Sequence, residues 1–201
     1  ETFVCIFMSS VLREHLSQLY PELRKAGFDI HHLFQVSWYN EIMPSKLHLP
    51  TFGKKDTSGL IIGNTKHLWE AFTKEIQETG QFPPNPLDQY TMNSIESALV
   101  KWANSGSSSI PYEIRWVHDT EPSRVVAVQK LANVAGMSYL CPHSYLSIHP
   151  KFGPWFAFRA VVLFHESFNL EVPDKIEHPS PASEAKMIAA TSAALASATG
   201  D

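Results

Sequence analysis

The sequence predicts a single domain of the α+β class. Its 201 residues are enough for one domain with a sizeable core. Hydrophobic residues make up 44% of the chain and charged residues 18%, which is typical of a globular protein rather than a disordered one. Segments with helical spacing of apolar residues are interleaved with five or six short apolar segments of strand length.

The N-terminal part predicts a helix followed by a strand. Apolar side chains recur at helical spacing over Val11–Ala26, and Gly27 is placed to end that helix. Pro21 lies inside it, so we expect two helical pieces or a kink. Phe28–Ser37 has the composition of a strand, and a slip in its apolar alternation suggests a β-bulge.

The next stretch predicts one strand and two helices. Ser58–Gly63 is a short apolar strand. Thr65 is the expected N-cap of a helix that runs to about Thr79. After a proline-rich connector, Asn85 or Asp88 opens a helix that runs to about residue 102.

Beyond a serine-rich loop at Ser105–Ser109, strands become more frequent. Ile110–His118 predicts a strand, and Arg124–Ala135 predicts a helix that the following glycine ends. Met137–Leu140 and Tyr145–Ile148 predict two short strands.

Trp155–Phe164 is almost continuously apolar, as a strand buried on both faces would be. Arg159 interrupts it, and an unpaired buried charge is costly. One interpretation is a structural ion pair, or an edge-strand arginine that reaches solvent. The other is a guanidinium that faces a pocket and binds a carboxylate or phosphate. The residues alone leave both interpretations open.

The C-terminal part differs in composition from the rest. Leu170–Pro181 is acidic and contains several prolines, and Ala182–Thr199 is rich in alanine and prone to form a helix. We therefore expect one domain over residues 1–174 and a loosely docked tail over residues 175–201.

Composition argues against several classes of protein. The net charge of −4 and the lack of a basic stripe argue against nucleic-acid binding, and no apolar run reaches the roughly 18 residues of a membrane span. Two cysteines cannot form a disulfide scaffold, so we expect a cytoplasmic protein. Glu1–Ser10 lacks the basic flank of a signal peptide. The ten histidines show no HExxH or HxxxH spacing, so we expect no metal site.

Aromatic residues are concentrated near a few polar ones, and this pattern suits a large flat ligand such as a flavin or a tetrapyrrole. Periodicity does not choose between these two ligands. The polar residues in question are Gln35, Asn40, Gln129, Asn133 and Arg159.

Five collinear segments carry a family resemblance. They are FQVSWYNE at 34–41 with HLP at 48–50, PLDQ at 86–89, the segment 126–136 ending in NVAG, IHPKFGPWFAFR at 148–159, and EVPD at 171–174. In this order they resemble conserved blocks of the cblC-type vitamin B12-processing proteins, the family of methylmalonic aciduria and homocystinuria type C.

The resemblance implies a fold similar to flavin-dependent nitroreductases, in which helices flank an antiparallel sheet. It implies a cytoplasmic enzyme that binds cobalamin base-off and removes its upper axial ligand. Cyanide leaves by reduction with electrons from reduced FAD or FMN, drawn from NADPH through a flavoprotein reductase. Alkyl groups pass to the thiol of glutathione, giving a thioether and Co(I). A cblD-type adaptor receives the product, and the protein is a monomer or a ligand-induced homodimer. A cobalamin chaperone without catalysis and a flavin-dependent reductase are the alternatives.

The resemblance also assigns residues. Arg159 matches the family arginine associated with glutathione and dealkylation. Asn133 stands where the family often has histidine, so that here the position can form hydrogen bonds but has no imidazole. The residues that match cobalamin-lining or neighbouring positions are Val126, Ala127, Val128, Gln129, Asn133, Tyr139, Leu140, Ser147 and Phe158.

Overall fold

The computed structural model describes residues 16, 18–80, 82–105, 110–174, 176 and 184–199. Its main feature is a four-stranded sheet in the order β1-β2-β6-β3, in which every neighbouring pair is antiparallel. The strands are β1 (Ile30–Gln35), β2 (Ser58–Asn64), β3 (Tyr112–Trp116) and β6 (Ala157–Phe164). The two inner strands are the most buried, as their apolar composition predicts.

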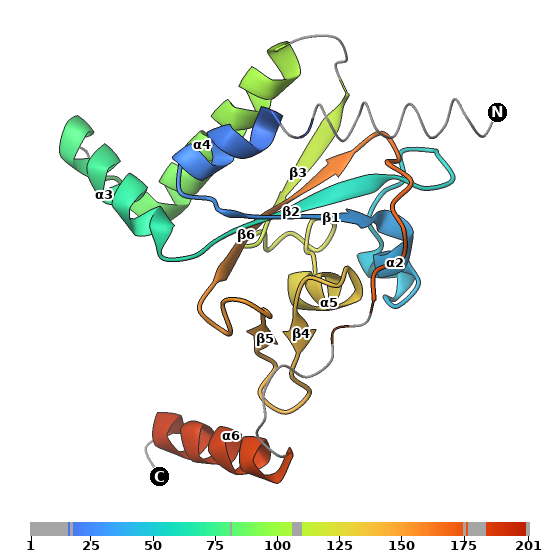
Figure 1. Ribbon diagram of the computed structural model, residues 1–201, viewed down its shortest axis with the longest axis vertical. Helices are drawn as coiled ribbons and strands as arrows, with labels where there is room; N and C mark the ends of the chain where they lie inside the picture. Colours follow the sequence, from blue (N-terminus) through green and yellow to red (C-terminus); the bar gives the residue numbers. More distant parts are fainter. Residues whose placement is uncertain are drawn as a thin grey trace.

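Helices cover both sides of this sheet (Figure 1). Helices α3 and α4 and the helical residues 18–25 lie on one side, which we call the helical face. On the other side, which we call the α5 face, lie α2, α5 and the small β4–β5 hairpin. The elements beyond the main sheet are α2 (Val36–Asn40), the 3-10 helix η1 (Ser45–Leu47), α3 (His67–Thr79), α4 (Pro86–Asn104), α5 (Val128–Val134), β4 (Tyr139–Leu140), β5 (Ser147–Ile148) and α6 (Glu184–Thr199).

Strand alternation divides the core into two clusters. Leu60 and Ile62 of β2 pack in the cluster under the helical face, whereas Ile61 between them packs under the α5 face. On β6, Val162 belongs to the first cluster and Val161 to the second. Successive side chains of a strand point to opposite faces, so the apolar run on each inner strand supplies both clusters.

The pairing of β2 with β6 contains a bulge. Ile62 is opposite Ala160 and Gly63 is opposite Phe158, so Arg159 is an additional residue on β6. Gly63 permits this geometry, because a Cβ atom there would lie 2.6 Å from the carbonyl oxygen of Ala157.

The predicted strand Phe28–Ser37 is wrong at its C-terminal end, where the chain turns into α2. The carboxylate of Asp56 explains this change, because it accepts hydrogen bonds from the Ser37 backbone N–H at 3.0 Å and from the Ser37 hydroxyl at 2.7 Å. The bulge predicted in this strand is also wrong, since β1 pairs with β2 in unbroken register.

The predicted helix Arg124–Ala135 begins four residues late, at Val128. Arg124 is held in a turn against β3, where it donates to the Ile114 carbonyl at 2.7 Å and pairs with Asp119. Thr65 is not the N-cap of α3, because Lys66 occupies that position and the Thr65 side chain bonds to Asp29 instead.

Other predictions agree with the structure. The strands at 58–63, 110–118 and 155–164 and the helix after residue 85 are present with small changes of boundary, and the two short strands form the β4–β5 hairpin. Helix α6 forms in the alanine-rich tail, and most of its described side chains are exposed. Residues 11–15 of the first predicted helix and 106–109 of the serine-rich loop lie outside the described residues. Among the helices described, none has the length and apolar character needed to cross a membrane.

Candidate functional site

The N-terminal end of α5 is fixed by Tyr39 of α2. The Tyr39 hydroxyl accepts a hydrogen bond from the Ala127 backbone N–H at 3.0 Å, and the Tyr39 side chain is fully buried. Burial raises the pKa of Tyr39, and the hydrogen bond to Ala127 partly opposes that rise. Val126 and Ala127 pack on the core cluster beneath, and Val128 belongs to it. The candidate cobalamin-lining residues Val126, Ala127 and Val128 therefore lie at a helix end that is held in place.

Helix α5 also holds the β4–β5 hairpin. The Asn133 side-chain oxygen accepts a hydrogen bond from the Leu140 N–H at 3.0 Å. Near the other end of the helix, the Gln129 amide donates to the Tyr145 carbonyl at 2.7 Å. Tyr145 has a φ of 56°, an uncommon conformation for a bulky residue. These two contacts bring Tyr139, Leu140 and Ser147 close to α5 from outside it.

Two buried hydroxyls in this region lack hydrogen-bond partners among the described residues. They belong to Ser147 of β5 and to Ser138, just before β4, and both residues are buried. Buried polar groups are nearly always hydrogen-bonded, so these hydroxyls indicate a partner outside the part of the chain that the structure describes. A ligand or bound water would satisfy them.

Aromatic rings form a connected group beside the hairpin. Phe158 meets Phe156 edge to face with ring centroids 5.0 Å apart, and Phe156 meets His149 at 5.8 Å. His149 lies 4.8 Å from Phe152. The pKa of His149 is lowered, first by burial and then by the nearby His32 and Lys151.

Large apolar side chains remain exposed on the segments next to α5 and on the segment between β5 and β6. Trp155 is 83% exposed and Tyr145 70% exposed, and Val125 and Leu146 are exposed as well. We call these four residues the apolar rim. Three of the four, Val125, Tyr145 and Leu146, lie on segments that precede α5 or bond to it. Single exposed apolar residues are common, but such a group is typical of a binding surface.

Arg159 does not join this group. Its Nε donates a hydrogen bond to the Asn64 side-chain oxygen at 2.7 Å, at the end of β2. The edge-strand interpretation is wrong because β6 is an inner strand, and among the described residues no carboxylate lies within ion-pair distance. Burial lowers the pKa of the guanidinium, and the Asp88 carboxylate of α4 partly opposes this, but the group stays charged.

Of the other polar residues singled out in the sequence, Gln35 and Asn40 have structural roles. The Gln35 amide donates to Asp56 and to Ser167, and Asn40 bonds the backbone of Leu49 in both directions. Sequence reasoning missed Asn64, whose pairing with Arg159 depends on the β2–β6 register and has no local sequence signal.

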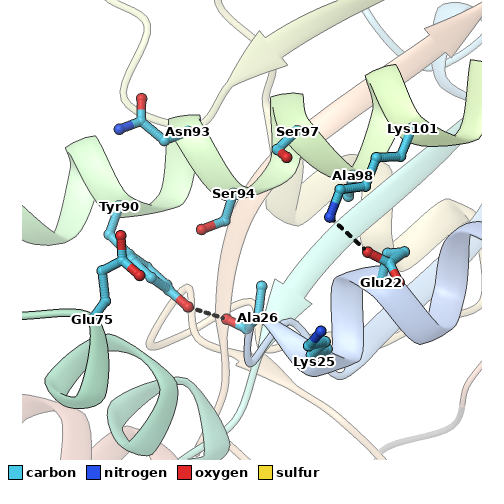
Figure 2. A pocket seen from close by; sticks show the side chains of 10 residues that line it. All are labelled: Glu22, Lys25, Ala26, Glu75, Tyr90, Asn93, Ser94, Ser97, Ala98 and Lys101. Atoms are coloured by element: carbon cyan, nitrogen blue, oxygen red, sulfur yellow. Dashed lines mark hydrogen bonds and ion pairs between the residues drawn. The ribbon is translucent and has the colours of Figure 1, made fainter. Parts of the chain in front are cut away.

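Two hollows bear on the question of a resident flavin, which would need cations or free N–H groups for its phosphate. The first, of about 420 Å³, lies on the helical face (Figure 2). There Lys101 pairs with Glu22 at 3.1 Å, the Tyr90 hydroxyl donates to the Ala26 carbonyl at 3.0 Å, and the lining carries both signs of charge.

The second hollow, of about 400 Å³, is lined by His32, Leu33, Trp38 and Ala135 and by residues 170, 171 and 173, with no lysine or arginine. The second lining therefore does not fit a flavin phosphate. The described residues also contain no group of three or more His, Cys, Asp and Glu side chains able to hold a metal ion.

Comparison with known proteins places the chain in a family. A family model described as the methylmalonic aciduria and homocystinuria type C family matches residues 27–197. A mouse protein named cyanocobalamin reductase / alkylcobalamin dealkylase is 30% identical over 164 residues, which are 74% of this chain and 55% of that protein. Its human counterpart is 29% identical over 168 residues, with the same coverage. This chain thus spans about half the length of these relatives.

Solved structures agree on the fold. The C. elegans B12-trafficking protein CblC, described as a homologue of human MMACHC, matches with a TM-score of 0.63 at 22% identity, over 88% of this chain and 79% of that one. An epoxyqueuosine reductase matches with a TM-score of 0.55 at 12% identity, over 88% of this chain and 51% of that one. The expected α+β, nitroreductase-like fold is confirmed. Since the family model covers most of the sequence, the chain belongs to the methylmalonic aciduria and homocystinuria type C family.

Proposed function

We propose that this chain processes vitamin B12, binding cobalamin base-off on the α5 face and removing its upper axial ligand. The observation that carries the proposal is the family match over residues 27–197, whose curated relatives are named cyanocobalamin reductase / alkylcobalamin dealkylase. The apolar rim supports it, because a surface of this kind suits a large, flat, mostly apolar ring.

The candidate residues fall into an apolar group and a polar group, and each would contact a different part of cobalamin. Val126, Ala127 and Phe158 offer apolar contact to the corrin. Polar groups meet its rim of amides, and Ser147 brings a buried hydroxyl that lacks a partner among the described residues. Trp155 is free to cover the ring and exclude water. Detaching the lower base lowers the coordination number of cobalt, which eases reduction and displacement at the upper face.

Dealkylation requires a thiol. The thiolate sulfur of glutathione attacks the alkyl carbon, and an S–C bond forms as the Co–C bond breaks. The electron pair of that bond stays on cobalt, which passes from Co(III) to Co(I), and the product is a thioether. The protein needs to orient the corrin, exclude water and hold glutathione. We propose that Arg159 binds a glutathione carboxylate, since its guanidinium is charged and partly buried.

Decyanation requires electrons from outside the chain. We propose reduced FAD or FMN as a diffusible donor, supplied from NADPH by a flavoprotein reductase. We further propose a cytoplasmic location, a cblD-type adaptor as recipient of the product, and a monomer that cobalamin can convert into a homodimer. In this proposal residues 1–174 form the cobalamin-processing domain and residues 175–201 the tail.

A spectral titration tests the central claim, with two tryptophans as a matched pair. Adding cyanocobalamin or methylcobalamin to micromolar protein should convert the corrin absorption to a base-off spectrum. Trp155→Ser should weaken cobalamin binding about tenfold, because it removes a large apolar contact. Trp69→Ser, which alters a 64% exposed tryptophan on α3, should leave the affinity unchanged. Absence of any spectral change with either cobalamin would refute the proposal.

The same sample separates the two alternatives. A chaperone would give the base-off spectrum but would not demethylate methylcobalamin with excess glutathione. A flavin-dependent reductase would oxidise reduced flavin with nitro compounds and leave the cobalamin spectrum unchanged. The proposal requires both the spectral change and turnover.

A further inference from the structure

The β6 bulge determines where the Arg159 side chain points. Arg159 is the additional residue of the bulge and therefore has no cross-strand partner on β2. Bulges of this kind redirect a side chain and are frequent beside functional sites. Phe158 packs with the cluster under the α5 face, whereas Ala160 packs with the cluster under the helical face. The strand thus changes its alternation at Arg159.

Asn64 restrains the redirected side chain. Its Oδ1 accepts the hydrogen bond from Arg159 Nε at 2.7 Å, and its Nδ2 donates to the Thr65 carbonyl at 2.7 Å. Asn64 is only 7% exposed. A flipped amide would place Nδ2 against the Arg159 N–H and Oδ1 against a carbonyl, which is two repulsive contacts. The acceptor of Asn64 is therefore committed to Arg159.

The restraint extends to a second, charged anchor. The Thr65 backbone N–H donates to one carboxylate oxygen of Asp29 at 2.7 Å, and its hydroxyl donates to the other. This fixes the loop between β2 and α3 that carries the Thr65 carbonyl. The contacts between Asp29 and Thr65 therefore fix the group to which the Asn64 amide donates, and this restrains the oxygen that binds Arg159.

Holding an arginine through Nε leaves the rest of the guanidinium available. Among the described residues, Asn64 is the one hydrogen-bond partner of Arg159, so Nη1 and Nη2 donate to no described group. Asn64 is neutral, and Asp88 is beyond ion-pair distance, so the positive charge is not cancelled. An ion pair at Nε would have fixed the side chain equally well but weakened its attraction for an anion.

We propose that Asn64 is a positioning residue, which holds the Arg159 guanidinium so that Nη1 and Nη2 bind a carboxylate of the thiol co-substrate. This inference rests on the proposed function, in which Arg159 binds glutathione. Asn64 touches neither glutathione nor cobalamin and acts through Arg159.

A double-mutant cycle tests the inference. The dissociation constant of glutathione is measured by calorimetry on cobalamin-loaded protein, together with the KM for glutathione in demethylation. Arg159→Gln should raise both about ten- to hundredfold, because it removes a charged bidentate donor. Asn64→Ala should raise them about three- to tenfold, because it removes one hydrogen bond that orients the donor. In the Arg159→Gln background, Asn64→Ala should have no further effect.

Two controls separate positioning from stability. Tyr90→Phe removes the hydroxyl contact to the Ala26 carbonyl and lies outside the Asp29–Thr65–Asn64 restraint, so it should lower Tm while changing glutathione affinity less than about twofold. The cobalamin dissociation constant should be the same in all four proteins of the cycle. A general loosening of the loop would instead weaken both ligands and would do so in the Arg159→Gln background too.

The outcomes for the two proposals differ. If Arg159→Gln weakens glutathione binding but Asn64→Ala does not, or if the two effects simply add, the positioning role is wrong and the proposed function stands. If wild-type protein binds cobalamin but not glutathione, or if Arg159→Gln has no effect, the proposed role of Arg159 fails and the role of Asn64 fails with it.

Discussion

The two faces of the sheet are built from the same strands but are covered very differently. The helical face lies under α3, α4 and residues 18–25, and its cluster includes Trp102, Phe164 and Phe168. The α5 face lies under a helix of seven residues and a hairpin of two-residue strands, with exposed Tyr145 between those two strands. Long helices can cover an apolar sheet face completely, whereas short ones leave apolar surface for a ligand. Under the proposed function, the contrast assigns cobalamin to the α5 face, whereas the helical face mainly stabilises the fold.

Substitution of two neighbouring isoleucines on β2 should cause the largest expected change, a loss of folding stability. Ile61 packs under the α5 face and Ile62 under the helical face, and both are fully buried. Ile61→Ala and Ile62→Ala should each lower the free energy of unfolding by about 2–5 kcal/mol, through lost burial and a cavity. Urea denaturation measures this change.

The same pair then distinguishes the faces by ligand binding. Ile61→Ala should also raise the cobalamin dissociation constant, because it loosens the support of α5, and Ile62→Ala should not. Equal weakening of cobalamin binding by both variants would contradict the division of the two faces.

Adjacent histidines on β1 give the next largest effect, in the pH dependence of stability. His31 stacks on Tyr20 on the helical face, and His32 bonds the Ala135 carbonyl at 2.6 Å on the α5 face. Burial, assisted by Arg24 and partly opposed by Asp29, lowers the pKa of His31 to about 4. Burial also lowers the pKa of His32, and the hydrogen bond to Ala135 opposes that shift.

The lowered pKa of His31 fixes the sign of the effect. At neutral pH both folded and unfolded chains carry the neutral imidazole, and below about 6.5 the unfolded chain gains a proton that the fold resists. Stability should therefore fall as the pH falls from about 6.5 to about 4, with a slope of up to about 1.4 kcal/mol per pH unit. His31→Gln should reduce this slope more than His32→Gln does. A larger reduction of the slope by His32→Gln would show that His32, and not His31, has the more strongly lowered pKa.

The sequence predicts the sheet better than the contacts of the site. Apolar runs identify β2 and β6 because central strands are buried on both sides, and this signal is local. The sequence predicts that the strand continues through Val36 and Ser37, yet Asp56, 19 positions away, bonds Ser37 and these two residues begin a helix. Asn64 shows the same limit, since it meets Arg159 across 95 positions through one strand register and one bulge. Family motifs locate candidate residues, but the contacts among them come from tertiary pairing.

Two tyrosines, one on each face of the sheet, allow the same comparison of the faces with a smaller expected change in stability. Tyr39 accepts the Ala127 N–H at 3.0 Å on the α5 face, and Tyr90 donates to the Ala26 carbonyl at 3.0 Å on the helical face. Tyr39→Phe and Tyr90→Phe should each lower stability by about 0.5–1.5 kcal/mol, because each leaves one backbone group without its partner. Only Tyr39→Phe should also weaken cobalamin binding, because it releases the helix end that carries Val126 and Ala127. Unchanged affinity in Tyr39→Phe would show that this anchor does not shape the binding surface.

Asn133→Ala is expected to have an equally small effect, on cobalamin affinity, and it tests whether the α5 face needs an ionisable group. An amide has no pKa near neutrality, and the Asn133 oxygen already accepts the Leu140 N–H at 3.0 Å, so its role is to hold β4 against α5. Asn133→Ala should lower cobalamin affinity by about 0.5–1.5 kcal/mol, the contribution of one hydrogen bond, and should leave substantial turnover. Asn93→Ala, which removes an exposed amide contact to Gln89 on α4, is the matched control and should change neither. Spectral titration and methylcobalamin demethylation with glutathione measure the two quantities. Complete loss of turnover in a folded Asn133→Ala protein would show that the amide acts on the reacting ligand directly, and that the α5 face carries chemistry as well as binding.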